Sequence, residues 1–286
     1  MNNQFDIGLK IMKTGLVLVV IKDLIYYLIL AEFYFGKDGI VPFKIYESIL
    51  ESIGLSFLEV LFSNIYGIYV FLLFSLFIAF LFLFDRYNLI TGLLLFICLT
   101  VIRLRNLYIM DSGDTLYTLL IFFLAFYTPG QREVKTESIG TYPIALAVKL
   151  QISLVYLFSG LWKLKGEMWL QGQAVYHILQ VEDFSMSGLS DYLIAYPVLP
   201  QGLTYFTILF EIGFPFLIWL KSFRLPLIVM GLMLHVGIFI LMRIDNFSLV
   251  MILSYFTMVS DREYIILKEN IKHYIGYAFP LFAQKK

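Results

Sequence analysis

Charged side chains are scarce in this 286-residue sequence: 15% of the residues are Asp, Glu, Lys or Arg, whereas 60% are hydrophobic and 18% aromatic. A soluble domain is about half apolar and a quarter charged. Polar side chains could not cover so much apolar surface in a globule of this size, which excludes a soluble domain. The same excess of apolar residues excludes a disordered chain. The composition therefore predicts an integral membrane protein.

Three further shortages narrow the class of protein. The 21 basic and 21 acidic residues cancel, so no net positive charge is available to attract nucleic acid. Cys98 is the single cysteine, which excludes a disulfide framework and a thiolate metal cluster. A zinc site needs three or four ligands. The chain has only His177, His235 and His273, the last of them in the predicted tail, so we expect no metal.

Long apolar runs are what the sequence does contain. A helix needs roughly 20 apolar residues to cross the hydrocarbon core. The runs are continuous and do not alternate, which favours helices over a transmembrane barrel. We predict an all-α polytopic bundle of about eight transmembrane helices, forming a single domain over residues 1–286. The predicted spans are 11–31, 64–84, 88–102, 114–128, 142–162, 203–220, 225–243 and 246–260.

The basic residues indicate how the bundle is oriented, because Lys and Arg collect in the short cytoplasmic loops of membrane proteins. With the amino terminus inside, the segments on that side hold 12 of the 21 Lys and Arg residues, and the opposite segments hold 7. The two others, Lys22 and Lys149, fall within spans. This distribution predicts a multi-pass protein of the cell membrane with both termini in the cytoplasm.

Three stretches outside the spans have patterns of their own. Residues 45–62 repeat apolar side chains four apart, which predicts an amphipathic helix on the membrane surface or capping the bundle. Residues 163–202 are too polar to span, and a loop of this length inside a compact bundle is more often functional than a mere connection. Residues 261–286 are predicted to form a basic interfacial tail attracted to anionic lipid.

Ionisable residues near or inside the spans are the candidate functional residues, because an ion in hydrocarbon costs about 2.5–3.5 kcal/mol even on lenient scales. Lys22 and Asp23 lie in the first span. Adjacent helical residues point about 100° apart, so at least one should find a partner on another helix, as an ion pair or as a substrate or proton site. Arg103 and Asp114 meet at one membrane boundary, as an anchor and a helix cap or as substrate contacts.

Lys163 stands where the fifth predicted span ends, beside Trp162. A lysine in this position can extend to the headgroups as an anchor. It can also stay in an apolar pocket, where desolvation favours the neutral amine and makes it a usable general base. The residue types and their spacing leave both interpretations open.

Glu211 and His235 fall inside the sixth and seventh spans. Gly213 and Pro215 follow Glu211, so the backbone there could be broken and able to bind a polar group. A lone histidine in an apolar helix is usually a hydrogen-bonded core residue, although it can also contact a ligand.

Several of these residues belong to stretches that resemble the signature of the HTTM family. This family includes the membrane domain of the vitamin K-dependent gamma-glutamyl carboxylases and the SdpB proteins of bacterial antimicrobial-peptide systems. Four stretches carry the resemblance in the same order along almost the whole chain. They are Tyr34 to Pro42, Arg103 to Asp114, Leu150 to Tyr176, and Glu211 to Pro215 followed by His235 and Gly237.

The resemblance implies a chemical role for one lysine. In the carboxylases a membrane lysine deprotonates reduced vitamin K, and it lies three residues after a glycine and just before a leucine. Lys163, between Gly160 and Leu164, matches that position. The implied cofactor is reduced vitamin K or another quinol, and no cofactor is indicated by the residues alone. Two departures weigh against glutamate carboxylation itself: only residues 261–286 follow the last span, and Asp111 and Asp114 replace the asparagine and histidine of the carboxylases.

We therefore expect a stand-alone bacterial member of the SdpB type, an enzyme or maturation factor that acts on a secreted peptide or a quinol-like lipid in the outer half of the membrane. Its partners would be membrane lipids, a secreted peptide precursor and a partner maturation protein. The alternatives are a transporter or exporter, and a non-catalytic immunity or scaffold protein. The expected catalytic residues are Lys163, His235 and Asp114, and the expected substrate contacts are Arg103, Tyr156, Trp169, Glu211, Lys22 and Asp23.

Overall fold

The computed structural model describes residues 4–107, 111–129, 140–182, 185–186 and 188–278, with side chains as far as residue 270. All regular structure within these residues is helical, as the sequence predicts. The helices are α1 (Asp6–Ile29), α2 (Ala31–Phe35), α3 (Phe43–Ile53), η1 (Ser56–Leu61), α4 (Ile65–Leu83), α5 (Asn88–Arg105), α6 (Ser112–Ala125), α7 (Thr141–Lys163), α8 (Glu167–Leu170), α9 (Ala174–Ile178), α10 (Leu189–Ala195), α11 (Val198–Leu217), α12 (Lys221–Met242), α13 (Asp245–Tyr255), η3 (Phe256–Met258) and α14 (Asp261–Ala278).

Each predicted span coincides with a helix, namely α1, α4, α5, α6, α7, α11, α12 and α13 with η3. Within the described residues, only α4, α5, α7 and α12 are by themselves long and apolar enough to cross a membrane, and the bent pair α10–α11, with 99° between its helices, makes a fifth candidate. The charges at Lys13, Lys22 and Asp23 lower the hydropathy of α1, while α6 with 14 residues and α13 with 11 are short. Eight helices lie where the sequence predicts them, and the crossing of the membrane by all eight remains a prediction.

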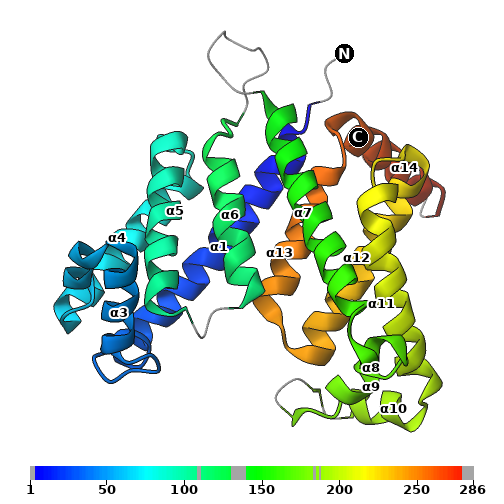
Figure 1. Ribbon diagram of the computed structural model, residues 1–286. Helices are drawn as coiled ribbons and strands as arrows, with labels where there is room; N and C mark the ends of the chain where they lie inside the picture. Colours follow the sequence, from blue (N-terminus) through cyan, green and yellow to red (C-terminus); the bar gives the residue numbers. More distant parts are fainter. Residues whose placement is uncertain (1–3, 108–110, 130–139, 183–184, 187, 279–286) are drawn as a thin grey trace.

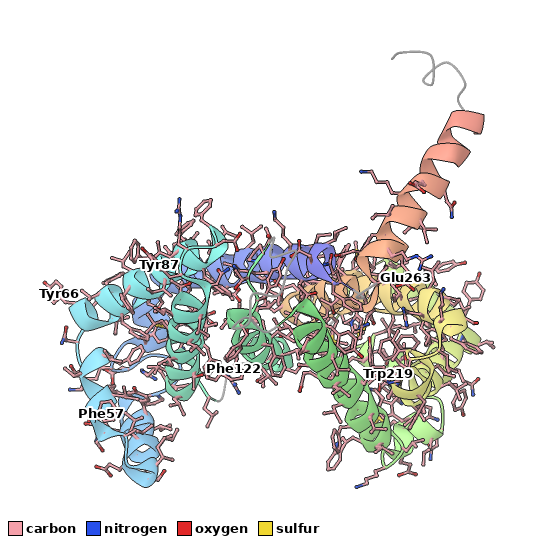
Figure 2. All side chains as sticks on the ribbon, turned by 90° about the horizontal axis from the view of Figure 1, so that it is seen from above. Phe57, Tyr66, Tyr87, Phe122, Trp219 and Glu263 are labelled. Carbon is pink, nitrogen blue, oxygen red and sulfur yellow. The ribbon has the colours of Figure 1, made fainter. Side chains whose placement is uncertain are left out.

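The helices lie side by side around an oblique central helix, α1 (Figure 1). Leu9, Met12, Leu16, Val20 and Leu24 on α1 are fully buried, and their spacing of three or four residues places them on one side of the helix. Viewed from above, Phe57, Tyr66 and Tyr87 mark one side of the molecule and Trp219 the other, with Phe122 of α6 between them (Figure 2). The core therefore runs across the bundle along α1.

The two ends of the bundle carry different elements. The start of α1 and helix α14 lie at one end, while α3 and α8–α10 lie toward the other (Figure 1). At the first end, Asp261 at the start of α14 joins this helix to α1. Its carboxylate oxygens accept hydrogen bonds from the backbone N–H groups of Asp6 at 3.1 Å and Ile7 at 2.9 Å. The predicted basic tail begins with this helix, and its residues 279–286 lie outside the described part of the chain.

The predicted amphipathic helix over 45–62 is in fact two helices, α3 and η1. Gly54 interrupts it with φ +72°, a left-handed conformation that ends α3. Tyr46 and Leu50 are fully buried, whereas the predicted apolar stripe faces outward, with Ile53 50% and Phe57 70% exposed. The prediction of one continuous helix was wrong because a glycine C-cap stops the helix halfway.

Much of the outer surface is apolar. On α4, Tyr66, Val70 and Phe77 are 80%, 68% and 58% exposed, and the outer faces of α11 and α12 are similar. Soluble proteins rarely expose contiguous patches of this kind. The surface is compatible with a membrane protein, in which lipid tails cover these side chains.

A buried arginine holds the link between α2 and α3. The Arg105 guanidinium at the end of α5 is fully buried and donates to the carbonyls of Val41 at 2.6 Å, Phe35 at 3.0 Å and Gly36 at 2.8 Å. Tyr46 of α3 packs against it, 5.8 Å from ring centroid to guanidinium carbon. Burial raises the pKa of the Tyr46 hydroxyl, and the Arg105 charge acts in the opposite direction. One side chain thus joins the end of α5 to the stretch from α2 to α3, which lies far earlier in the sequence.

Candidate functional site

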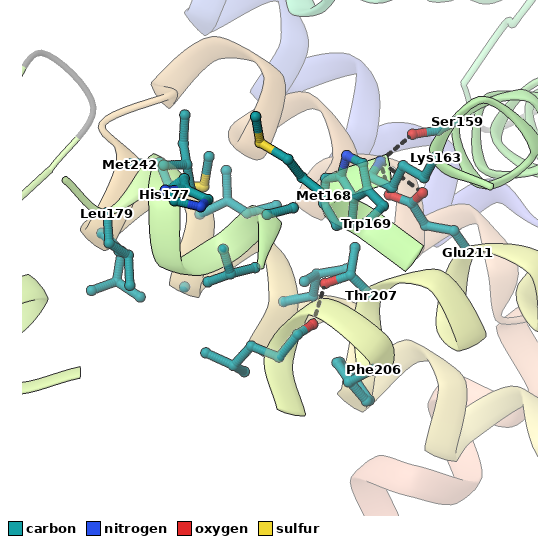
Figure 3. Close-up of a pocket in the computed structure, with 18 of the residues that line it drawn as sticks. Ser159, Lys163, Met168, Trp169, His177, Leu179, Phe206, Thr207, Glu211 and Met242 are labelled. Atoms are coloured by element: carbon teal, nitrogen blue, oxygen red, sulfur yellow. Dashed lines mark hydrogen bonds and ion pairs between the residues drawn. The ribbon is translucent and has the colours of Figure 1, made fainter. Parts of the chain in front are cut away.

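Lys163 and Glu211 form an ion pair between α7 and α11. The Lys163 ammonium lies 2.8 Å from each carboxylate oxygen of Glu211 and 2.6 Å from the Ser159 hydroxyl, one turn earlier on α7 (Figure 3). The two side chains are 18% and 9% exposed. The lysine therefore points inward to a carboxylate.

A glycine allows α7 and α11 to approach closely at this point. A Cβ on Gly160 would lie 2.7 Å from the Ile212 side chain and 3.2 Å from the Cβ of Glu211, both inside normal contact distance. The absence of a side chain at 160 thus lets Glu211 reach Lys163 one turn further along α7. Small residues serve the same purpose where membrane helices pack against each other.

Trp169 covers the ion pair from the polar segment after α7. The chain turns at Gly166 into the short helix α8, which carries the Trp169 ring to 4.9 Å from the Lys163 ammonium. An indole face attracts a cation at this distance. The segment packs on α11, because the backbone N–H of Val175 donates to the Thr204 hydroxyl at 3.1 Å. The predicted polar loop is thus a wall of the site.

These residues line a cavity of about 1310 Å³. Its walls come from α7, α8, α9, α11, α12 and the start of α13, and most of them are apolar. Met168, Trp169, His177 and Met242 lie around the space next to the ion pair, with Phe206 on the α11 side (Figure 3). An apolar lining with a few polar groups is typical of small-molecule sites, and the volume exceeds the roughly 300–1,000 Å³ of most of them.

A chain of buried hydrogen bonds reaches the cavity from the core. The Tyr156 hydroxyl lies 2.7 Å from Nε2 of His235 and forms a second hydrogen bond with the Tyr255 hydroxyl. Tyr156 and His235 both line the cavity, and all three side chains are at most 2% exposed. Nδ1 of His235 is buried and has no hydrogen-bond partner among the residues described.

Lys22, Asp23 and Asp114 gather in a second cluster that is not part of the cavity lining. Asn246, at the start of α13, accepts from the Lys22 ammonium at 2.6 Å and donates to Asp23 at 2.9 Å and to Asp114 at 3.1 Å. Lys22 also contacts the adjacent Asp23 at 3.2 Å and Asp245 at 3.2 Å. The charges of the first span thus have a partner on another helix, as expected, and also touch each other.

Asp114 is a helix-capping residue in this structure. It forms a capping box with Asp111: the Asp114 N–H donates to the Asp111 carboxylate at 2.9 Å, and the Asp111 N–H donates back at 3.1 Å. Asp111, three residues earlier, is therefore the N-cap, and Asp114 is the third residue of the helix. No described contact brings Asp114 to Lys163 or His235, so the structure does not assemble the expected catalytic trio.

Arg103 joins neither cluster. It is half-buried in the last turn of α5, its Nε atom is buried without a partner, and no hydrogen bond links its side chain to another described residue. The neighbouring Arg105 makes the interhelical contacts. Of the expected site residues, the cavity brings together Lys163, Glu211, Tyr156, Trp169 and His235.

Sequence reasoning missed three residues at the site. Ser159 could have been found, because a side chain four residues before Lys163 lies on the same helix face. Tyr255 left no signal, since a tyrosine in an apolar helix is indistinguishable from an ordinary core residue. Phe247 packs on His235 with ring centroids 5.5 Å apart. It could not be singled out, because its place beside His235 depends on where α13 begins.

Comparisons of the chain with family models, curated proteins and solved structures found no match. Among the residues described, no three His, Cys, Asp or Glu side chains are grouped so as to hold a metal ion.

Proposed function

We propose that the protein is a multi-pass membrane protein of the HTTM type that binds a quinol-like lipid in the cavity and removes a proton from its hydroxyl group. The observation that carries this proposal is the Lys163–Glu211 pair on the wall of a 1310 Å³ apolar cavity. The apolar walls suit the ring and tail of such a lipid, and the ion pair is the polar group that can receive its proton.

The Lys163–Glu211 pair can accept one proton from either of two starting protonation states. It can be an ammonium beside a carboxylate, or an amine beside a carboxylic acid. In both cases a proton from the ligand hydroxyl converts the pair to an ammonium beside a carboxylic acid and leaves an oxyanion on the ligand. Lys163 as base and Glu211 as base are therefore two descriptions of one coupled proton site. The Lys163 ammonium then stabilises the oxyanion in a poorly hydrated space.

The other residues divide into two groups. Tyr156, Trp169 and His235 line the cavity and are placed to contact the ligand. Lys22, Asp23 and Asp114 are placed to hold α1, α6 and α13 together, because Asn246 of α13 donates to Asp23 and Asp114 and Asp245 of α13 pairs with Lys22. We assign this cluster to the stability of the bundle, and the ligand contacts to the cavity.

A secreted peptide is the second candidate ligand, and one observation favours it. A further hollow of about 480 Å³ adjoins the cavity and shares Gln171, Gln173 and His177 with it. Its lining carries neutral amide, imidazole and phenol groups, and Gln201 belongs to this hollow alone. Uncharged donors and acceptors of this kind suit the amides of an extended peptide. If the ligand is a peptide and not a quinol, we expect Gln201→Ala to weaken the binding of the peptide. We also expect that a quinone does not compete with the peptide.

Tryptophan fluorescence tests the binding of a quinone directly. The chain has three tryptophans, so Trp162→Phe with Trp219→Phe leaves Trp169 in the cavity as the single reporter. In nanodiscs, decylubiquinone is expected to quench this variant along a saturating curve, because a bound quinone lies next to the indole. The matched control keeps Trp162 alone, which is 74% exposed and not part of the cavity lining. There we expect only a linear decrease from quinone dissolved in the lipid. Equal linear quenching in both variants contradicts the proposal and favours a scaffold role.

The proposed orientation places the cavity in the outer half of the membrane, with both termini in the cytoplasm. Lys10, near the start of α1, and Lys165, between α7 and α8, are exposed, and the start of α1 and helix α8 lie toward opposite ends of the bundle (Figure 1). In a Cys98→Ala background, Lys165→Cys should react with a membrane-impermeant maleimide in intact cells. Lys10→Cys should react only after permeabilisation. The reverse pattern would invert the proposed topology.

A further inference from the structure

We propose that His235 presents an Nδ1–H donor to the cavity and that the ligand carries an oxygen acceptor which binds there. This inference rests on the proposed function and narrows its ligand class. The ligand then has two oxygen functions: a hydroxyl that gives its proton to the Lys163–Glu211 pair, and a second oxygen that accepts from His235.

The position of His235 is defined by its neighbours. The side chain is 1% exposed and lines the cavity. The Phe247 ring packs edge-on against the imidazole at 5.5 Å, and the Tyr255 and Tyr156 rings lie 6.1 Å away. Nε2 is taken by the Tyr156 hydroxyl at 2.7 Å, whereas Nδ1 is buried and has no hydrogen-bond partner among the residues described.

The hydroxyl groups determine which nitrogen carries the proton. Tyr255 has one hydroxyl proton, and in the described part of the chain its only hydrogen-bond partner is Tyr156. If Tyr255 donates to Tyr156, the Tyr156 proton is free to be donated to Nε2 of His235. The opposite direction would leave the Tyr255 proton without an acceptor at a residue that does not line the cavity, whereas this order leaves only the Nδ1–H of the cavity-lining His235 without a protein acceptor. The order Tyr255 to Tyr156 to His235 therefore satisfies every hydroxyl and leaves one donor that a ligand can satisfy.

This order makes Nδ1 the protonated nitrogen of a neutral imidazole. An accepting Nε2 cannot carry the proton, so Nδ1 has it. The resulting N–H group is buried and has no acceptor within the described residues. A buried donor of this kind selects for a ligand that supplies an acceptor, such as a quinone carbonyl or a quinol oxygen. A pure hydrocarbon or an ammonium group offers none.

The glycine at position 231 keeps this arrangement in place. A Cβ on Gly231 would overlap the Tyr255 hydroxyl, so the close approach of α12 and α13 depends on this residue. The same approach brings His235, four residues later on α12, over the Tyr156 hydroxyl. The tautomer is thus set by backbone packing and not by a charged neighbour within hydrogen-bond distance.

Nitrogen NMR of the full chain labelled with ¹⁵N-histidine tests the tautomer. Only three histidines contribute signals, and His235→Asn identifies the pair that belongs to residue 235. We expect a protonated Nδ1 and an unprotonated Nε2 at neutral pH. Tyr156→Phe should convert this single tautomer into a mixture, because the donor to Nε2 is gone. A protonated Nε2 in the unaltered protein would overturn the inference without any ligand being added.

The ligand contact is tested by adding decylubiquinone, with decylbenzene as the control that lacks oxygen. The quinone should shift the Nδ1 signal of His235, and decylbenzene should leave it unchanged. Quenching of Trp169 in parallel samples reports whether the quinone is bound. Bound quinone with an unmoved Nδ1 signal refutes the acceptor site and leaves the proposed function standing. No saturable quenching at all refutes the proposed function, and the acceptor site with it.

Discussion

Lys163→Ala is expected to slow the removal of a proton from bound quinol by on the order of 10²-fold or more, the range that a positioned acid or base contributes. The reason is that the proton site loses the ammonium that stabilises the oxyanion, and Glu211 alone remains. The rate can be followed through oxidation of decylubiquinol by dissolved oxygen, because the quinol anion gives up electrons faster than the neutral quinol. We expect Glu211→Gln to show a loss of similar size.

Lys165→Ala is the matched control for this loss. Lys165 lies two residues further along, is exposed, and stacks on Trp162 at 5.1 Å, outside the cavity lining. Its removal changes the charge at the same end of the bundle without touching the ion pair, so quinol oxidation should stay as in the unaltered protein. Full activity of Lys163→Ala, or an equal loss in Lys165→Ala, would refute the role assigned to the pair.

A pair of variants separates chemistry from folding. Removing one partner of a buried ion pair leaves an uncompensated charge and costs about 3–5 kcal/mol of stability, whereas replacing both partners by apolar residues is often neutral. Lys163→Met with Glu211→Leu should therefore recover the unfolding temperature that Lys163→Ala loses. Its quinol oxidation should stay at the background rate. Recovery of both properties would mean that the pair only holds α7 and α11 together.

Arg105→Ala should have the largest effect on stability of any single substitution at the other side of the bundle. The buried carbonyls of Phe35 and Val41 lose their donor together, and the carbonyl of Gly36 keeps only the N–H of Gly39. Each unsatisfied buried group costs about 1–3 kcal/mol, so a total loss of at least about 2 kcal/mol is expected. Urea unfolding in detergent micelles, followed by tyrosine and tryptophan fluorescence, measures it.

Arg105→Lys and Arg103→Ala test the cause of that loss. A lysine ammonium has no planar fork and cannot reach three carbonyls in the same geometry, so Arg105→Lys should be intermediate. Arg103→Ala, on the same helical turn, should cost less than about 1 kcal/mol, since the half-buried Arg103 side chain has no described hydrogen bond to lose. A larger loss in Arg103→Ala than in Arg105→Ala would contradict the assignment of the buried donor.

The candidate residues of the cavity could be singled out one by one from the sequence. Lys163, Glu211 and His235 stand out because ionisable groups in an apolar run are costly and need a reason to be there. The sequence did not show that these three residues lie together at one cavity. It depends on α7, α11 and α12 lying side by side, and on close approaches at Gly160 and Gly231 that only packing reveals.

The sequence could not show which of the two arginines at the end of α5 faces the core. Arg103 and Arg105 are two residues apart and therefore point to nearly opposite sides of one helix. In a soluble protein the apolar face would show which side is inward. Around α5 both sides are apolar, because lipid as well as the core takes up apolar side chains, so the sequence alone favoured Arg103 where the structure buries Arg105.

Composition and continuous apolar runs were sufficient for the helical class and for the positions of eight helices, because these depend on local hydropathy and chain length. The rotation of each helix, the partner of each buried charge and the cavity beside Lys163 required the folded structure. The physical reason is that apolar side chains face lipid as well as the core, so hydropathy does not distinguish the inner face of a helix from its outer face. The contacts that define the site come from helix packing and hydrogen bonds between segments distant along the chain.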